Sequence, residues 1–390
     1  MSKKIKVAVV GMRFGAEFVP IYLHHPWVEA VAICDSNPDA LNEVGNKFGV
    51  ERRFTSMDDL LASGDYDAVH LVTPVTYHAE HSIAVLNAGM HCACTIPMGL
   101  SMEELYRVLE AKRQSGKNYM MMETACYTRE FLYAKEMYES GEMGKIQFMR
   151  CAHYQDMDGW PEYWKGFPPL MHPTHALGPV LDLIGKRPLK VYALGSGSMR
   201  EELVRKYNNP FPIETAIYQL EDSDVAVELT RTMFHTAKAY SESFNVYGDK
   251  ASFEWQQIEE ELPIVMRIGD LTEHRGRPIS IERVEVPDRA ELLPKEIQRF
   301  TKRGVYDENN PHLSFLQGGG HGGSHPHLVH EFVSSILEGR APHIDEVKSA
   351  TWTAAGICAH ESALQGGREI AIPNFKEYSL NETALTQSEG

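Results

Sequence analysis

A glycine-containing turn near the start of the chain has the residue pattern of a phosphate-binding loop. Gly11 and Ala16 follow the apolar run Ile5–Val10 and occupy the first and third positions of G-x-G-x-x-G/A, where small residues let the backbone approach a pyrophosphate. Arg13 replaces the second glycine, and both Arg13 and Phe14 are candidate cofactor contacts. The turn therefore predicts dinucleotide binding, and the alternative is an ordinary tight turn between a strand and a helix.

Asp35 ends the second apolar run, Val28–Cys34, and lies 24 residues after Gly11. Dinucleotide-binding domains have an acidic residue about 20 residues after the glycine turn, where it accepts hydrogen bonds from the ribose hydroxyls. Because a carboxylate repels a 2′-phosphate, Asp35 favours NAD over NADP. The alternative is an aspartate that only caps the following helix.

Histidines in two later loops are candidates for proton transfer, because histidine titrates near neutrality and can carry a proton in both directions. His172 and His175 follow a proline- and aromatic-rich loop, and their alternative is a structural role at a helix start. His321 lies among five glycines, in a loop that can approach a ligand closely or serve only as a link. Four histidines fall within ten residues here, but no acid or cysteine is patterned with them, so we predict no metal. These four are His321, His325, His327 and His330.

The stretch Asp158–Lys165 is the richest in aromatic residues. Trp160 and Trp164 have faces that can stack on the C–H face of a sugar, and Lys165 could bind an anionic substituent. The alternative is a hydrophobic plug between two domains. The sequence leaves these two interpretations equally open.

The secondary structure predicted from the sequence differs between the first third of the chain and the rest. Up to about residue 125, apolar runs of four to eight residues alternate with helical segments such as Met102–Ser115, which predicts a parallel sheet with helices on both faces. After about residue 145, runs such as Ile146–Tyr154 alternate with polar residues, as in an antiparallel sheet with one wet face. We therefore predict an α/β domain over residues 1–125, an α+β domain over 126–375 and a polar tail over 376–390.

Composition excludes several classes of protein. The chain has 390 residues, 43% of them hydrophobic and 24% charged, which is typical of a globular protein and not of a disordered one. Its net charge of −16 argues against nucleic-acid binding, which needs a basic surface. No stretch approaches the ~18 apolar residues of a membrane span. The first residues lack a signal-peptide pattern, so we expect a cytoplasmic protein with reduced cysteines.

Two further motifs give the chain its resemblance to the Gfo/Idh/MocA oxidoreductase family. Thr73, Pro74 and His78 form a T-P-x-x-x-H pattern after the third strand, and 246–253 is similar to the family's glycine turn. The resemblance implies a Rossmann domain followed by an α+β domain with a large, mostly antiparallel open sheet. It also implies that the substrate lies between the nicotinamide and that sheet, and that the protein is a homo-oligomer through it.

The family's catalytic motifs are altered in this chain. Most family dehydrogenases have Glu-Lys-Pro after the fourth strand, with the lysine as acid and base, whereas this chain has Thr95-Ile96-Pro97. His175 matches the histidine of the family's D-x-x-x-H pair, but Met171 replaces its aspartate. Thr95 and Pro97 remain candidate cofactor contacts. One branch of the family lacks this lysine: the NAD-dependent glycoside hydrolases, of which α-N-acetylgalactosaminidases are the best-known group.

Three segments resemble that branch. They are 121–127, similar to M-E-N-C-C-Y; 172–179, similar to Y-P-T-H-G-L-G-P; and 319–323, similar to G-G-H-G-G. The resemblance implies cleavage of a small, possibly anionic or N-acetylated glycoside without net redox change. A tightly bound, recycled NAD oxidises the sugar at C3, the aglycone leaves by elimination, water adds, and the sugar is reduced again. The sugar, its anomer and its aglycone stay open.

The same resemblance suggests roles for single residues. His175 is the expected base at the oxidised hydroxyl, and His172 is expected to share its pocket. Tyr127 and Glu123 follow the last strand of the first domain, where side chains point into the cleft. Tyr127 is therefore expected to orient the sugar or act as an acid, and Glu123 to contact the nicotinamide. His321 and His325 are expected to contact the sugar. Two other functions stay open: an NAD-dependent sugar or cyclitol dehydrogenase, in which a histidine replaces the missing lysine, and a non-catalytic NAD or sugar sensor.

Overall fold

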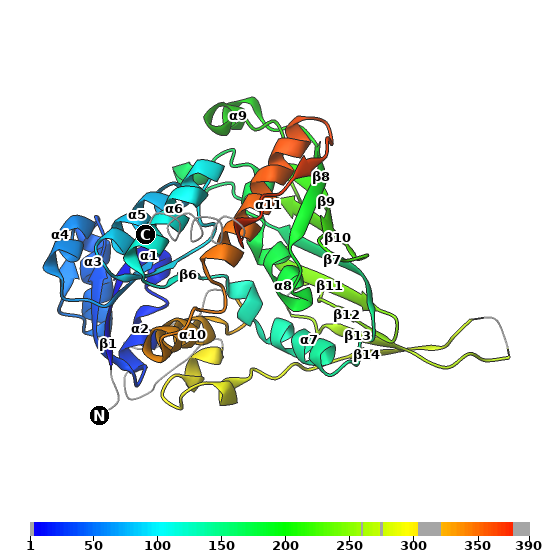
Figure 1. Cartoon of the computed structure of the whole chain (residues 1–390), viewed down its shortest axis with the longest axis horizontal. Coiled ribbons are helices and arrows are strands. Elements are labelled where there is room, and N and C mark those ends of the chain that lie inside the picture. Colours follow the sequence, from blue (N-terminus) through cyan, green and yellow to red (C-terminus); the bar gives the residue numbers. More distant parts are fainter. Residues whose placement is uncertain (1–3, 259, 274–275, 303–320, 377–390) are drawn as a thin grey trace, which may run out of the picture.

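The chain forms two sheets with helices between them (Figure 1). The structure is a computed structural model that describes residues 4–258, 260–273, 276–302 and 321–376. All six cysteines are buried and free. Within the described ranges, no helix combines the length and apolar character that a membrane span requires.

The first sheet is parallel, with the strand order β3-β2-β1-β4-β5-β6. Its strands are β1 (Ile5–Val10), β2 (Val28–Cys34), β3 (Arg53–Phe54), β4 (Ala68–Leu71), β5 (His91–Cys94) and β6 (Tyr119–Met121). The order reverses between β1 and β4, and in such sheets a ligand crevice opens at the carboxyl ends of the strands on either side of the reversal. This confirms the predicted Rossmann domain and brings the glycine turn after β1 beside the loop after β4.

Six helices connect the strands of the first domain: α1 (Met12–Gly15), α2 (Val19–His24), α3 (Pro38–Phe48), α4 (Met57–Ser63), α5 (His78–Asn87) and α6 (Met102–Ser115). Side-chain caps begin several of them. The Asn37 side chain accepts hydrogen bonds from two backbone N–H groups at the start of α3, and the Ser101 hydroxyl accepts one at the start of α6. The helical segment after Gly11 is not continuous, because α1 ends at Gly15 and α2 begins with Pro20 in its first turn.

The second sheet has nine strands in the order β14-β13-β12-β11-β7-β10-β9-β8-β15. All neighbours are antiparallel except β7 and β10, which confirms the predicted mostly antiparallel sheet. The strands are β7 (Ile146–Tyr154), β8 (Pro188–Ser196), β9 (Ile213–Leu220), β10 (Ala226–Thr232), β11 (Ser241–Gly248), β12 (Ala251–Glu254), β13 (Ile264–Ile268), β14 (Ile279–Arg283) and β15 (Ile370–Ala371).

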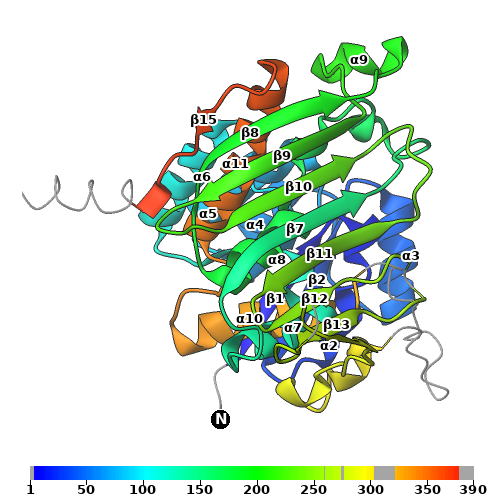
Figure 2. The ribbon, with the colours of Figure 1, turned by 90° about the vertical axis from the view of Figure 1, so that its right-hand side faces the viewer.

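The described part of the chain after residue 125 contains the α-helices α7 (Arg129–Glu139), α8 (Thr174–Ile184), α9 (Glu201–Tyr207), α10 (His325–Glu338) and α11 (Glu346–Leu364). Helices α8 and α11 pack on one face of the second sheet, and its other face is seen without helices in Figure 2. That open face exposes Tyr192, Leu194 and Ile217. Assembly of several copies through this sheet stays a prediction.

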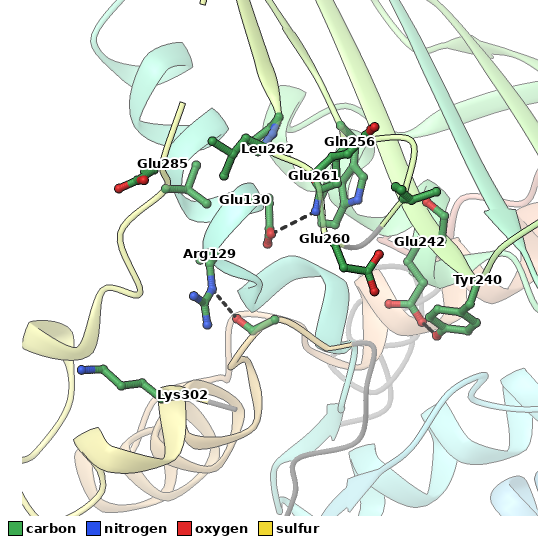
Figure 3. Close-up of a pocket in the computed structure, with 16 residues that line it drawn as sticks. Arg129, Glu130, Tyr240, Glu242, Gln256, Glu260, Glu261, Leu262, Glu285 and Lys302 are labelled. Carbon is green, nitrogen blue, oxygen red and sulfur yellow. Dashed lines mark hydrogen bonds between the residues drawn. The ribbon is translucent and has the colours of Figure 1, made fainter. Parts of the chain in front are cut away.

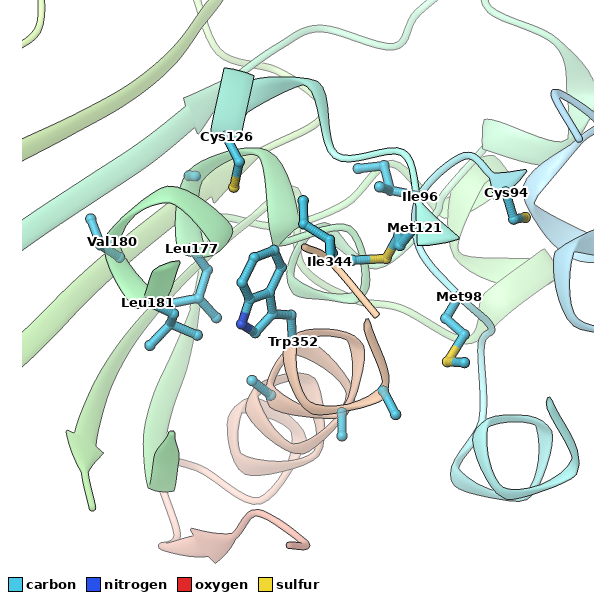
Figure 4. Close-up of a cluster of buried hydrophobic side chains, with 14 of the residues drawn as sticks. Cys94, Ile96, Met98, Met121, Cys126, Leu177, Val180, Leu181, Ile344 and Trp352 are labelled. Atoms are coloured by element: carbon cyan, nitrogen blue, oxygen red, sulfur yellow. The ribbon is translucent and has the colours of Figure 1, made fainter. Parts of the chain in front are cut away.

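Two late helices join the domains. Helix α11 is buried almost all round, and its Trp352 lies among Leu177 of α8, Ile344 and Met121 at the end of β6 (Figure 4). Helix α10 belongs by sequence to the predicted second domain, but its apolar side chains, among them Phe332, share a core cluster with β1 and β2 of the first domain. The ends of the first sheet are therefore held firmly against the second domain.

Candidate active site

A cavity of about 320 Å³ lies where the carboxyl ends of the first sheet's strands meet the second domain. We call it the cleft. The first domain contributes Phe14, Thr73 and Thr95 to its lining, while the second contributes His153 of β7 and His175 of α8. The cleft therefore has the position that the chain's resemblance predicts for nicotinamide and substrate.

The glycine turn after β1 is built for close approach. Gly11 has φ of 95°, and a Cβ atom there would lie 2.4 Å from the carbonyl oxygen of Val72. Its N–H donates to the carbonyl of Cys34 at 2.8 Å. Any side chain at this position would collide with the backbone after β4, so only glycine fits.

The acid predicted to bind ribose lies at this turn. One oxygen of Asp35, Oδ2, accepts the N–H of Met12 at 2.6 Å, and Oδ1 accepts the N–H of Asn37 at 2.8 Å. Each carboxylate oxygen has a further lone pair for a hydroxyl donor. Arg13 is exposed beside the turn, and Phe14 lines the cleft. These residues fit an adenine dinucleotide, with Asp35 at its ribose and the turn at its phosphates.

His78 ties together the loops that follow β4 and β5. Its ring is buried, with Nδ1 at 2.7 Å from the carbonyl oxygen of Pro97 and Nε2 at 2.8 Å from that of Thr73. Burial lowers its pKa. The side chains of Thr73 and Thr95, on the two loops that His78 joins, line the cleft, and Pro74 begins the short turn 75–77. We interpret His78 as an anchor for the predicted cofactor loops.

The position that holds the family's lysine is apolar here. Ile96 is 7% exposed and lines the cleft, and Met122 at the end of β6 lies in the same lining. Neither side chain can transfer a proton. Any acid–base chemistry in this cleft must come from other residues.

His175 is the first of these residues, and it lies between two buried carboxylates. Its Nδ1 is 2.6 Å from Glu123 Oε1, and its Nε2 is 3.6 Å from Glu242 Oε1. Burial alone would lower the pKa of His175, but Glu123 and Glu242 together raise it above its usual value. Glu123, which was predicted to contact the nicotinamide, lies beside His175. The N–H of Ala125 donates to the same Glu123 oxygen and so holds the carboxylate in place against the His175 ring.

Glu242 is the centre of a cluster that the sequence analysis missed. Its carboxylate lies 3.3 Å from His321 Nδ1 and accepts the Tyr240 hydroxyl, and both of those residues line the cleft. Burial would raise the pKa of Glu242, but His175 and His321 lower it to about 2, so the group is charged at neutral pH. The pKa of Tyr240 is well above its usual range, first because it is buried and then because Glu242 is charged. No local motif marks Tyr240 or Glu242, since strand pairing alone sets Glu242 opposite His153.

Three histidine rings meet on the second domain's side of the cleft. His153 lies 5.3 Å from His175 and 6.2 Å from His172, measured between ring centroids. Arg231 of β10 is fully buried beside them, donating to the His153 carbonyl and to the Gln155 side chain. Burial, and then the charges of Arg231 and His175, hold the pKa of His153 well below its usual range. In the part of the chain that the structure describes, neither ring nitrogen of His153 has a hydrogen-bond partner.

The predicted aromatic contacts divide into two groups. Trp160 and Trp164 both line the cleft, and Trp164 packs edge-on against His172 with ring centroids 5.1 Å apart. Lys165 does not line it. Its amine pairs with Glu162 at 2.7 Å on the surface, so the expected contact to an anionic substituent is not supported.

Two other expected site residues lie outside the cleft lining. Tyr127 packs into the apolar core, and its buried hydroxyl has no hydrogen-bond partner among the described residues. The tyrosines that line the cleft are Tyr163 and Tyr240. His325 is 2% exposed behind His321, packed against Phe14 with its Nδ1 3.3 Å from a carboxylate oxygen of Glu17.

Comparison with curated proteins points to one family. Residues 5–123 match the NAD-binding Rossmann fold of the Gfo/Idh/MocA oxidoreductase family, and residues 135–371 match its C-terminal alpha/beta domain. A glycosyl hydrolase family 109 protein of Stenotrophomonas maltophilia is 23% identical, covering 96% of this chain and 89% of its own length. Glycosyl hydrolase family 109 protein 1 of Phocaeicola vulgatus is 21% identical, covering 96% and 84%.

Solved structures share the fold. Levoglucosan dehydrogenase in complex with NADH and L-sorbose has a TM-score of 0.75 at 18% identity, covering 95% of this chain and all of its own. The scyllo-inositol dehydrogenase of Lactobacillus casei with bound NAD(H) and scyllo-inositol has a TM-score of 0.67 at 21% identity, covering 95% and 99%. The two domain matches together span most of the sequence, so the chain belongs to the Gfo/Idh/MocA oxidoreductase family and its cofactor is NAD.

Proposed function

We propose that the protein is an NAD-dependent glycosidase that cleaves a small glycoside by transient oxidation, elimination, addition of water and re-reduction. Bound NAD supplies the hydride acceptor and donor at the sugar's C3. The protein must then move protons at three places: the C3 hydroxyl, the neighbouring C2–H and the oxygen of the leaving group. Its relatives named glycosyl hydrolase family 109 support this reaction class.

One observation carries the proposal. A single buried carboxylate, Glu242, lies next to three proton carriers, His175, His321 and Tyr240, which all line the same cleft. Net oxidation of an alcohol needs one base. Elimination needs a second base and an acid as well, and the cluster supplies candidates for all three.

We assign the roles from charge and position. His175 accepts the C3 hydroxyl proton at Nε2, while Glu123 holds its Nδ1–H and fixes the ring. His321, held by Thr124 and Glu242, accepts the C2 proton. Tyr240 is protonated at neutral pH and donates to Glu242 in this structure; to act as the acid, its hydroxyl turns from Glu242 to the leaving oxygen and donates there. Glu242 is a positioning residue: its carboxylate stabilises a positive charge on either histidine and accepts the Tyr240 hydroxyl.

The lining also favours a sugar as the ligand. Trp160 is 46% exposed, and with Trp164 it offers aromatic surface at one side of the cleft. Gln155 and His153 offer hydrogen-bonding groups next to this surface. A ring with an apolar C–H face and hydroxyl edges matches this pairing of apolar and polar groups.

A second candidate is a net dehydrogenase for a sugar or cyclitol. The pair of His175 and Glu123 suffices as the base for such a reaction, and proteins of this fold include levoglucosan and inositol dehydrogenases. This candidate leaves Tyr240 and His321 without a role in proton transfer.

Solvent labelling separates the two. We would cleave a 4-nitrophenyl glycoside in D₂O and examine the released sugar by NMR. Elimination through a C3 ketone places deuterium at C2, and His321→Asn is expected to slow both cleavage and labelling. A released sugar without deuterium would contradict the proposed route, and accumulation of an oxidised sugar with NADH would favour the dehydrogenase.

A further inference from the structure

A second cavity, of about 450 Å³, lies on the other side of the catalytic cluster (Figure 3). It opens between α7, the start of β11 and the segments that follow β12 and β14. Tyr240 lines both cavities and Glu242 lines the second one, so this hydrogen-bonded pair forms the wall between them. The loop 321–322 completes this wall, because His321 faces the cleft and Gly322 faces the second cavity.

Acidic side chains outnumber basic ones in the described lining of the second cavity. The described lining includes five glutamates, against the two cations Arg129 and Lys302. The glutamates are Glu130, Glu242, Glu260, Glu261 and Glu285. Arg129 donates to the backbone carbonyls of Thr301 and Gly322, and Figure 3 shows Lys302 set apart from the glutamates. Among the described lining residues, a cationic ligand would therefore meet more carboxylates than cations.

A buried amide in the same lining also lacks a partner. Gln256 is 8% exposed and donates from Nε2 to Glu130 at 3.3 Å, while its Oε1 is buried with no hydrogen-bond partner among the described residues. An unpaired buried carbonyl oxygen is costly, and a ligand donor would satisfy it. Trp255, also in the lining, has an aromatic ring that can attract a cation. An ammonium group can donate a hydrogen bond to the amide oxygen and form ion pairs with the carboxylates, and its charge is attracted to the indole ring.

We infer that this cavity receives an ammonium group carried by the leaving group, so that the preferred substrate is a glycoside of an amine-bearing alcohol. The inference rests on the proposed function, in which Tyr240 donates to the leaving oxygen. Because Tyr240 lines both cavities, the part of the substrate beyond that oxygen is expected to extend past Tyr240 into the second cavity.

The first experiment needs no turnover. Titration calorimetry compares benzylammonium chloride with benzyl alcohol on the whole protein. We expect the cation to bind at least tenfold more tightly, and high salt to weaken it. The variant Glu260→Gln/Glu261→Gln is expected to bind it about fivefold less tightly, in line with ~1 kcal/mol for exposed charges. The control Glu201→Gln, on the exposed surface of α9, keeps the wild-type affinity. Equal binding of cation and alcohol would overturn the inference.

The second experiment uses turnover. Glycosides of one sugar carrying 2-aminoethyl or 2-hydroxyethyl leaving groups differ only in charge. We expect kcat/KM to be at least tenfold higher for the amine, and the double glutamine variant to reduce this ratio about fivefold. Equal kcat/KM values would overturn the leaving-group role. Cation binding that disappears in the double variant, with neither glycoside cleaved, would contradict the proposed function but retain the ammonium site.

Discussion

The two walls of the cleft offer different groups for proton transfer. The wall from the first domain presents Thr95, Ile96 and Met122, none of which titrates near neutrality. The opposite wall presents histidines and a tyrosine, with the carboxylate of Glu242 behind them. His78 is titratable on the first wall, but both of its ring nitrogens face backbone carbonyls.

The difference suggests that cofactor binding and proton transfer are assigned to different domains. In relatives with Glu-Lys-Pro, the lysine would lie on the first wall, beside the nicotinamide. Here the first domain holds the cofactor loops, and the proton carriers come from β7, β11, α8 and the loop before α10. In the proposed mechanism, proton transfer is therefore carried out by the second domain, where several candidate carriers share one buried carboxylate.

Removing that carboxylate is expected to have the largest effect. Glu242→Gln should lower kcat for glycoside cleavage about 10³-fold, because His321 and Tyr240 lose the charge that positions them. Steady-state kinetics on a chromogenic glycoside measure this. Glu228→Gln, on strand β10 of the same sheet, is the control and should retain activity. If Glu242→Gln lowers kcat less than tenfold, proton transfer does not depend on the Glu242 cluster, and the proposed difference between the two walls is wrong.

Removing Glu123 is expected to shift the pH profile. Glu123 raises the pKa of His175, and His175 must be neutral to accept a proton. Glu123→Gln therefore lowers the pKa of His175 and moves the acidic limb of the kcat profile to lower pH, while kcat at its maximum falls about tenfold. If the acidic limb of the kcat profile does not shift in Glu123→Gln, Glu123 does not act through His175.

Restoring the family's lysine on the first wall tests whether its position alone decides the reaction. Ile96→Lys places an amine at a site that is 7% exposed, so we expect about tenfold slower cleavage and a less stable protein. NADH should still not accumulate. Net NADH formation with loss of cleavage would show that one lysine is enough to change the reaction.

A variant of a buried carboxylate outside the cleft is expected to lower the stability of the protein without changing its catalysis. Asp182 on α8 accepts from His343 and Lys348, both at distances below 3 Å. Burial would raise the pKa of Asp182, but these partners lower it to about 2. Its stabilisation is therefore complete above about pH 4 and is lost as pH falls towards 2. Asp182→Asn should cost about 2 kcal/mol in urea unfolding at pH 7 and leave kcat unchanged. A large fall in kcat would contradict this separation.

The smallest effect is expected at Lys165. Its amine pairs with Glu162 on the surface, 52% exposed and outside the cleft lining. Lys165→Ala should change kcat/KM less than about twofold for any sugar in a panel, since such surface pairs contribute little. A selective loss for anionic sugars would restore the role that its sequence position suggested.

Local patterns predicted much of the fold. β1, β2 and β7 are short runs with a clear apolar pattern, and α6 has both a Ser101 cap and a terminal glycine, so their bounds agree with the sequence analysis. β13 and β14 were not foreseen, because β14 is exposed throughout and carries no core-facing pattern.

The site was harder to predict than the fold. His175, His321 and Trp164 belong to recognisable segments and do line the cleft. Tyr240 and Glu242 come from a strand edge whose position depends on its pairing with β7. Tyr127 was assigned to the cleft because it follows the last strand of the first sheet, but the short turn 124–127 directs its ring into the core.

The central claim, that proton carriers on the second wall support cleavage without net oxidation, is tested most directly by one assay. The purified protein, without added NAD, is incubated with chromogenic glycosides of neutral, N-acetylated and anionic sugars in both anomers, and aglycone and NADH are followed together. We predict aglycone in large molar excess over bound NAD with no lasting NADH. NADH that accumulates when NAD is added, with no aglycone released, would contradict the claim.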